Sequence, residues 1–230
     1  MTGEVEKMTT EEVQVIERLR PQWTRIVQEL GGDLEHADET FTEIIQRYRT
    51  GDGRAYHNLF HIDRMLGFIN QFDHLAKNKH MLKAAIFGHD IVYVPASPIN
   101  EQESADVFGL ILKKLSVRKE DIEETKRLIM ITKEHKTTDD DIDGKLIIDS
   151  DYEILASPDE TYDRYAANIW KENVGSEKVS EEAFRKGRAR FINGWLDSIR
   201  EDRLFLIPEI REKLQPQANR NLERELLRLK

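Results

Sequence analysis

The chain has 230 residues, a length that suits one domain of moderate size or two small ones, and we expect one. It carries 44 acidic and 35 basic residues, a net charge of −9, so it has no overall positive field to hold a nucleic-acid backbone or an anionic membrane. It contains no cysteine, which excludes disulfides and thiolate-bound metals and leaves histidine and oxygen as metal ligands.

Apolar residues recur at spacings of three and four along most of the chain, which predicts an all-α, single-domain helical bundle. In chain order we expect helical segments over residues 13–30 (interrupted at Pro21), 37–48, 55–75, 81–92, 100–115, 121–135 and 149–155, and long helices from about 160, 181 and 217. We divide the chain into an N-terminal extension or helix, residues 1–20, and one domain, residues 21–230.

Two features bear on location and assembly. No stretch approaches the ~20 apolar residues of a membrane span, and the N-terminal residues mix Glu and Lys, which predicts a soluble, cytoplasmic protein that binds neither membrane nor polymeric nucleic acid. The last helix carries an apolar stripe that we expect to pack either on the domain or on a second copy in a homo-oligomer. The stripe comprises Leu222, Leu226, Leu227 and Leu229.

His57 and His61 stand four residues apart in a segment with a broad apolar surface. On one helix their side chains would face the same way, about 5–6 Å apart at Cβ, and could address one site together. The alternative is a chance pair of surface imidazoles. Because Leu59, Phe60 and Ile62 favour burial, at least one imidazole needs a partner, and a metal ion is one.

His89-Asp90 follows an apolar run, residues 84–87, that is typical of a helix in the middle of a bundle. An ionisable pair placed there costs several kcal/mol if its charges are unpaired, so we expect a cation nearby. A core histidine bonded to a carbonyl is the alternative. Asp149 and Asp151 come later, after a second apolar run. Imidazoles and carboxylates that converge with one position open are what a water-activating metal requires.

These residues resemble those of the HD superfamily of metal-dependent phosphohydrolases, an all-α fold. The likeness extends over about residues 20–230 to one bacterial-type branch of predicted HD phosphohydrolases. Its matching segments are Arg54-x-Tyr56-His57-Asn58-Leu59-x-His61-Ile62, His89-Asp90-x-x-Tyr93, Asn100-Glu101-x-x-Ser104-Ala105, Tyr162-x-x-Tyr165, Phe184-x-x-Gly187-Arg188, Leu204-Phe205 and Asn219-x-Asn221-Leu222. One departure is Ile169-Trp170-Lys171-Glu172-Asn173, where the branch usually has arginine in place of Trp170 and tyrosine in place of Asn173, so no role of that arginine carries over.

The resemblance also implies roles. Tyr-His-Asn followed by a second histidine is similar to the cyclic-nucleotide phosphodiesterases, which implies that His61 binds metal and His57 protonates the leaving oxygen; the reverse assignment is the alternative. Ser150-Asp151-Tyr152 fits the end of the HD signature best, so Asp151 is the expected closing ligand. Asp149 is the alternative ligand, and otherwise a hydrogen-bond acceptor or a helix N-cap.

Three further residues are candidates for the same pocket. A histidine at the position of His135 binds phosphate or a second metal in similar HD proteins, although the helix dipole alone also favours histidine at a helix C-terminus. Glu101 resembles a polar residue that lines the pocket. Arg54 suits a phosphate oxygen because its charge does not titrate. Both Glu101 and Arg54 fit surface ion pairs equally well.

The implied function is hydrolysis of a small phosphate ester or anhydride, expected to be a nucleotide. A divalent ion (Zn, Mn, Fe, Co, Ni or Mg) would be held by His61, His89, Asp90 and Asp151, a water activated there would attack phosphorus, and His57 would act as the acid. The alternatives are a di-iron oxygenase of the same fold and a non-catalytic helical domain that binds a nucleotide or a metal. A two-metal site of the oxygenase kind usually has extra histidines between the His-Asp pair and the last aspartate of the site. Because His135 is the only histidine in that interval, the oxygenase is disfavoured.

Overall fold

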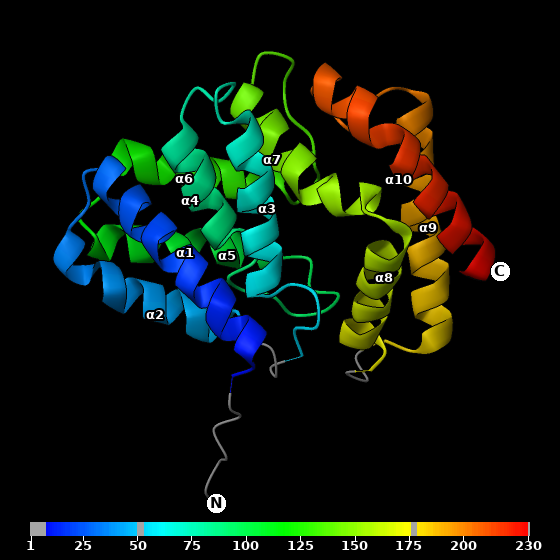
Figure 1. The fold of residues 1–230 in the computed structure, drawn as a ribbon, viewed down its shortest axis with the longest axis horizontal. Helices are drawn as coiled ribbons and strands as arrows, with labels where there is room; N and C mark the ends of the chain where they lie inside the picture. Colours follow the sequence, from blue (N-terminus) through cyan, green and yellow to red (C-terminus); the bar gives the residue numbers. More distant parts are fainter. Residues whose placement is uncertain (1–7, 50–52, 176–178, 230) are drawn as a thin grey trace, which may run out of the picture.

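The computed structural model describes residues 8–49, 53–175 and 179–229, which form ten α-helices and two short 3₁₀ helices and contain no strand (Figure 1). The expected all-α fold is confirmed. In chain order the helices are α1 (Thr10–Glu29), η1 (Leu34–His36), α2 (Ala37–Arg47), α3 (Leu59–Phe72), α4 (Lys79–Gly88), α5 (Asn100–Lys114), α6 (Lys119–Ile131), α7 (Ile142–Tyr152), η2 (Glu153–Ala156), α8 (Asp159–Asn173), α9 (Glu181–Arg200) and α10 (Pro208–Leu229).

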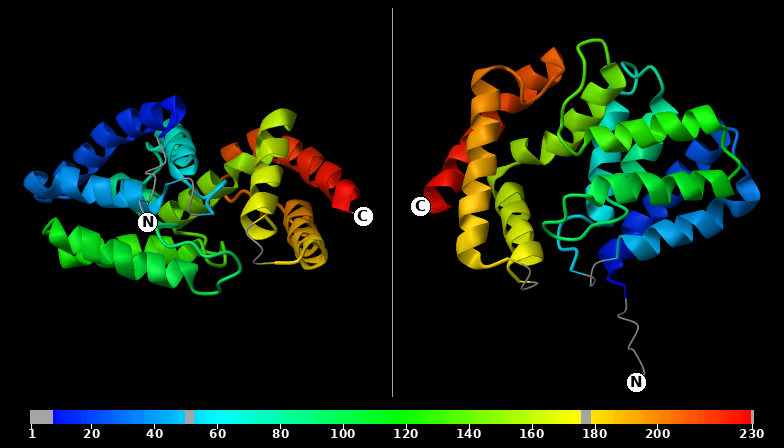
Figure 2. Two further views of the ribbon diagram at one scale, coloured as in Figure 1. Left: turned by 90° about the horizontal axis from the view of Figure 1, so that it is seen from below. Right: turned by 180° about the vertical axis from the view of Figure 1, so that it is seen from behind.

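Helices α1 to α7 pack into the larger part of the molecule, and α8, α9 and α10 stand beside it after the chain passes through η2 (Figures 1 and 2). The core of the larger part is built around Trp23, whose ring centroid lies 5.3 Å from that of Phe87 and 5.9 Å from that of Phe108. These three rings join α1, α4 and α5. The described residues include no helix with both the length and the apolar character that crossing a bilayer requires.

Helix α4 is the central element that carries His89 and Asp90 at its C-terminal end, as expected from its apolar sequence. It packs against α1, α3, α6 and α7. Its last residue, Gly88, lies so close to α5 that a Cβ atom there would be 2.4 Å from Cγ of Phe108. Glycine therefore permits the close approach of the two helices, and a buried helix end places the His-Asp pair inside the molecule.

Several expected helix bounds differ from the structure: α3 begins at Leu59 rather than at residue 55, and α7 spans Ile142–Tyr152 rather than residues 149–155. Helix α1 continues through Pro21, because Leu19 and Trp23 on its buried face anchor both sides of the proline. The expected boundary at residue 20 falls inside this helix, and residues 1–7 lie outside the described chain. The division into residues 1–20 and 21–230 stays a prediction. Helix α6 ends at Ile131 instead of continuing to His135, whose φ of 50° is incompatible with a right-handed helix.

The last helix begins at Pro208, nine residues before the expected start, and contains Pro216. Its apolar stripe packs mainly on the chain's own core: Leu222 is buried, and Leu226 and Leu229 are partly buried against the core. Leu227 is 69% exposed. Most of the stripe is therefore accounted for by packing within the domain.

Candidate metal centre

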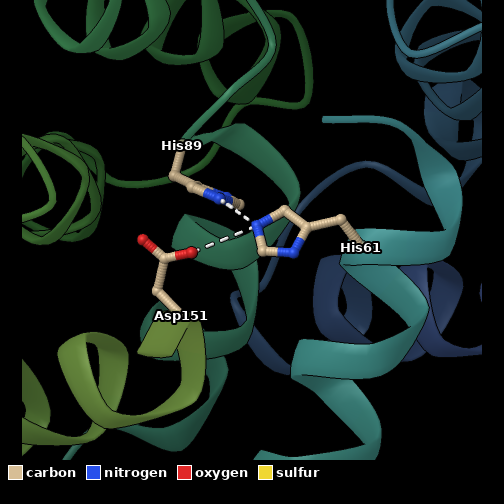
Figure 3. Close-up of side chains that lie close together, drawn as sticks. All are labelled: His61, His89 and Asp151. Atoms are coloured by element: carbon tan, nitrogen blue, oxygen red, sulfur yellow. Dashed lines mark hydrogen bonds and ion pairs between the residues drawn. The ribbon is translucent and has the colours of Figure 1, made fainter. Parts of the chain in front are cut away.

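His61 from α3, His89 from the end of α4 and Asp151 from α7 converge at one point (Figure 3). Nε2 of His61 lies 3.1 Å from Nε2 of His89 and 3.2 Å from Oδ1 of Asp151. One ligand atom from each residue lies within 4.8 Å of the others, and both imidazoles are buried. This group can hold a metal ion.

Asp90 faces the same point from the residue after His89. Its Oδ2 lies 3.1 Å from Nε2 of His89 and 3.8 Å from Nε2 of His61. Its backbone N–H donates to the hydroxyl of Tyr48, which is buried, so the position of Asp90 is fixed from outside the cluster. Asp90 therefore lies beside the group of His61, His89 and Asp151 without belonging to it, and its role as a fourth ligand stays a prediction.

The hydrogen bonding and charge of the cluster fit a cation. Nδ1 of His89 donates to the carbonyl of Ile86 at 2.9 Å, so a metal ion would bind at Nε2, where it would replace the second proton of the ring. Burial opposes charge on His89, yet the adjacent carboxylate of Asp90 outweighs it and raises the pKa of His89 to about 9. Positive charge is thus favoured here, and two imidazoles with carboxylates form a suitable ligand set for Zn, Mn, Fe, Co or Ni.

Asp149 does not take part in this cluster. Its carboxylate accepts hydrogen bonds from the backbone N–H groups of Leu206 at 2.7 Å and Ile207 at 2.9 Å, in the segment between α9 and α10. It lies inside α7, so its interpretation as the N-cap of a following helix is wrong, because the apolar run before it is already helical. Between the two aspartates, the geometry favours Asp151 as the ligand, and Asp149 is an acceptor that joins α7 to the C-terminal helices.

His57 lies outside α3, contrary to the expectation that His57 and His61 share a helix. The side chain of Asn58 caps α3 by accepting from the N–H of Phe60 at 3.0 Å, and the extended backbone of Asn58 ends helical geometry at that point. The two imidazole rings are still neighbours, with centroids 6.1 Å apart. His61 faces the metal cluster, whereas His57 faces a different partner.

That partner is Glu172 of α8, a buried carboxylate. Its Oε2 lies 2.7 Å from Nδ1 of His57, and its Oε1 accepts from the backbone N–H groups of Tyr56 and His57. Burial opposes charge on His57, but the charges of Glu172 and Asp90 outweigh it and raise the pKa of His57 above its ordinary value. The ring of His57 also stacks on Tyr93, with centroids 4.0 Å apart. His57 is therefore held in place, its raised pKa favours the protonated form, and Nε2 is its remaining nitrogen.

His135 points toward the cluster, as its interpretation as a ligand of phosphate or of a second metal requires. Its Nε2 lies 2.8 Å from Oδ2 of Asp151, and its ring stacks on Tyr152 with centroids 4.4 Å apart. Since Oδ1 of Asp151 faces His61, the two carboxylate oxygens have separate partners. Burial opposes charge on Asp151, and the hydrogen bonds from His135 and His61 hold its pKa well below the ordinary range. Asp151 is therefore an anion that points toward His61.

Arg54 and Glu101 lie elsewhere. Arg54 is buried and donates to the carbonyl oxygens of His57 and Asp90, both at 2.8 Å, and of Ile91 at 3.2 Å. These bonds tie the segment before α3 to the segment after α4, so the contacts of Arg54 indicate a structural role. Glu101 lies in the first turn of α5 and is not among the residues that line the cavity beside the metal centre. Phosphate binding by Arg54 and pocket lining by Glu101 stay predictions.

A cavity of about 450 Å³ opens beside the metal centre, between the larger part of the molecule and helices α8 and α9. His57, His135 and Asp151 form part of its wall. Each of these side chains is about one-fifth exposed, whereas those of His61 and His89 are almost completely buried. A small molecule in the cavity would therefore meet the outer members of the cluster first.

Sequence reasoning missed Glu172 as a functional residue. A signal was present, because Tyr162, Tyr165, Ile169 and Glu172 follow helical spacing on one face of α8. A glutamate on an apolar face needs a partner. Which partner it finds is a question of tertiary packing, since His57 lies 115 residues earlier.

In comparisons with known proteins, no family model, no curated protein and no solved structure matches the chain. The fold and the site by themselves define the class. This is an all-α protein with a buried histidine and aspartate group that can hold a metal ion beside a cavity.

Proposed function

We propose that the protein is a metal-dependent phosphohydrolase of the HD superfamily that acts on a small phosphate ester or anhydride, such as a nucleotide. The observation that supports this most strongly is the pairing of two distinct groups on one cavity. One is the cation site of His61, His89 and Asp151, with Asp90 beside it. The other is His57, an imidazole at the wall of the same cavity, whose pKa is raised by the charges of Glu172 and Asp90.

A divalent cation, when bound, would supply activation of water near neutral pH and would neutralise charge on the phosphoryl oxygens. His61, His89 and Asp151 would hold it, and Asp90 would complete the set. His135 would keep one oxygen of Asp151 occupied so that the other faces His61. In the proposed hydrolysis, the oxygen of a water molecule would form a bond to phosphorus as the bond from phosphorus to the leaving oxygen breaks. The water would lose one proton to solvent, and the leaving oxygen would gain one from His57.

His57 is the general acid in this scheme. Its Nδ1 proton is engaged by Glu172, so Nε2 carries the proton that passes to the departing oxygen. Glu172 is a positioning residue, because it touches His57 and the backbone around it rather than the reacting atoms. A general acid placed in this way contributes typically about 10²–10⁴-fold to the rate.

The experiment that tests the function is a screen of nucleoside mono-, di-, tri- and cyclic phosphates, with added divalent metals and with His89→Ala as the control. Metal-dependent phosphate release that the control lacks would support the proposal. Metal bound stoichiometrically without turnover of any of these compounds would count against it, and bound iron would favour the oxygenase alternative.

A further inference from the structure

The cavity beside the metal centre is lined mostly by apolar and aromatic side chains. Its far wall is formed by aromatic and aliphatic side chains of η2, α8 and α9, among them Leu155, Ile169, Phe184 and Trp195. Its volume of about 450 Å³ falls in the range of sites that enclose an organic molecule of moderate size. A phosphoryl group at the metal centre would therefore have an apolar space next to it.

The charges around the cavity argue against a second phosphate in that space. Three basic side chains, His57, His135 and Arg188, are found among the described residues that line it, and no lysine. His57 and His135 are paired with Glu172 and Asp151 near the metal centre. The remaining basic group, Arg188, lies at the far wall.

Arg188 is already neutralised. Its Nε and Nη2 donate to the two carboxylate oxygens of Glu225 at 2.8 and 3.1 Å, and its Nη1 donates to the hydroxyl of Tyr165 at 3.2 Å. Its guanidinium also lies over the rings of Tyr165 and Trp195, about 5 Å from each centroid. A bidentate, buried ion pair of this kind is costly to break, so Arg188 supports the wall and leaves no free positive charge for an anionic ligand.

We infer that this cavity binds the organic group of the substrate and that this group is uncharged and largely apolar, of about the size of a fused bicyclic ring. The inference rests on the proposed phosphohydrolase function and narrows it: the substrate class is a phosphate ester of an apolar, uncharged group rather than a polyphosphate. Flat rings fit best, because the wall is rich in aromatic side chains, among them Tyr152 and Trp195, whose centroids are 5.9 Å apart, and aromatic rings pack well against one another.

Two glycines of α9 allow a matched test. Gly187 lines the cavity, and a Cβ atom built there meets nothing within 4 Å, so a side chain at this position extends into open space. Gly194 is also helical and equally unobstructed, but it does not line the cavity. Leucine at either position changes helix propensity alike. Gly187→Leu therefore takes up part of the cavity, and Gly194→Leu is its control.

The experiment measures binding of non-hydrolysable phosphonates to the manganese-loaded protein by isothermal titration calorimetry. The probes are methylphosphonate, 1-naphthylmethylphosphonate and a sulfonated form of the latter. We expect the naphthyl probe to bind roughly tenfold or more tightly than methylphosphonate to the wild type, since a buried bicyclic ring removes a large apolar area from water. Gly187→Leu should abolish that preference, Gly194→Leu should keep it, and the sulfonated probe should not show it.

A wild-type protein without the preference would overturn the inference, as would a preference that persists in Gly187→Leu or that disappears in both variants. Should Gly187→Leu fail to fold, Phe191→Asp replaces it, because Phe191 lines the cavity and is 67% exposed. If the naphthyl probe is preferred by the wild type and by Gly194→Leu but not by Gly187→Leu, and the protein hydrolyses no phosphate ester, the proposed function alone is overturned. Hydrolysis without the preference would overturn the apolar subsite alone.

Discussion

Nδ1 of His57 lies 2.7 Å from Oε2 of Glu172, and this pair joins the segment before α3 to helix α8. The other oxygen of Glu172 accepts from two backbone N–H groups, so the carboxylate holds both the ring and the backbone of His57. The pair holds His57 at the cavity wall, and the charge of Glu172 helps to raise the pKa of this proposed acid.

Replacement of Glu172 by glutamine should move the pH profile of turnover. The charge of Glu172 helps to raise the pKa of His57 above its ordinary value of 6.5, so protonated His57 persists to higher pH in the wild type. Without that charge the pKa falls, and kcat should decline at a lower pH than in the wild type, with a loss of roughly 10–100-fold at neutral pH.

The matched control is Glu153→Gln, since Glu153 pairs with Arg64 and does not line the cavity. The measurement is kcat against pH for both variants, with metal content determined alongside. A Glu172→Gln profile that coincides with that of the wild type would show that Glu172 does not set the protonation of His57.

Replacement of His57 by asparagine should separate acid catalysis from metal binding. We expect metal content to stay at the wild-type level, because His57 faces Glu172 rather than the cation site, while kcat falls by roughly 10²–10⁴-fold. Elemental analysis and phosphate release give the two readouts. Parallel loss of metal would make His57 a ligand and support the reverse assignment of His57 and His61.

The two aspartates of α7 should respond differently to metal. A divalent ion that binds only the folded protein raises the free energy of unfolding by about 2.7 kcal/mol at 100 times Kd. We expect that increase in the wild type and in Asp149→Asn, whose altered side chain contacts Leu206 and Ile207, but not in Asp151→Asn. The measurement is the shift in thermal unfolding on addition of manganese. A normal shift in Asp151→Asn would remove Asp151 from the ligand set.

Gly88→Ala should destabilise the fold. Its Cβ would lie 2.4 Å from the ring of Phe108 and 2.9 Å from Ile129, so α4 and α5 would have to separate, at a cost of roughly 1–3 kcal/mol. The control is Gly67→Ala in α3, which meets nothing within 4 Å and should be neutral or stabilising. Urea unfolding measures both. Equal stabilities of the two variants would contradict the close approach of α4 to α5.

Much of this structure follows from local sequence patterns. Apolar spacing indicated the all-α fold, and the apolar run before His89 correctly placed that residue and Asp90 at the end of a core helix. The convergence of His61, His89 and Asp151 was expected from the resemblance of their pattern rather than from any single segment. The fold class and the position of His89-Asp90 depend on which face of a helix is buried, and that face can be read from the sequence.

The features that sequence reasoning missed depend on contacts between distant segments. Asp149 was among the expected acceptors, but its partner Leu206, 57 residues later, was not foreseen, and neither was the pairing of Glu172 with His57 across 115 residues. Arg54 donates to backbone carbonyl oxygens, which every residue offers, so no sequence pattern marks them. The cavity likewise arises where α8 and α9 pack beside the rest of the chain, and only the packing reveals its apolar wall.

The central claim is that His61, His89 and Asp151 hold a metal ion that phosphate-ester hydrolysis requires. The most direct test is elemental analysis of purified wild type and His89→Ala, run together with metal-supplemented phosphate release and with circular dichroism to confirm folding. We predict stoichiometric metal and turnover in the wild type and neither in folded His89→Ala. Undiminished turnover by a His89→Ala protein that holds no metal would contradict the claim.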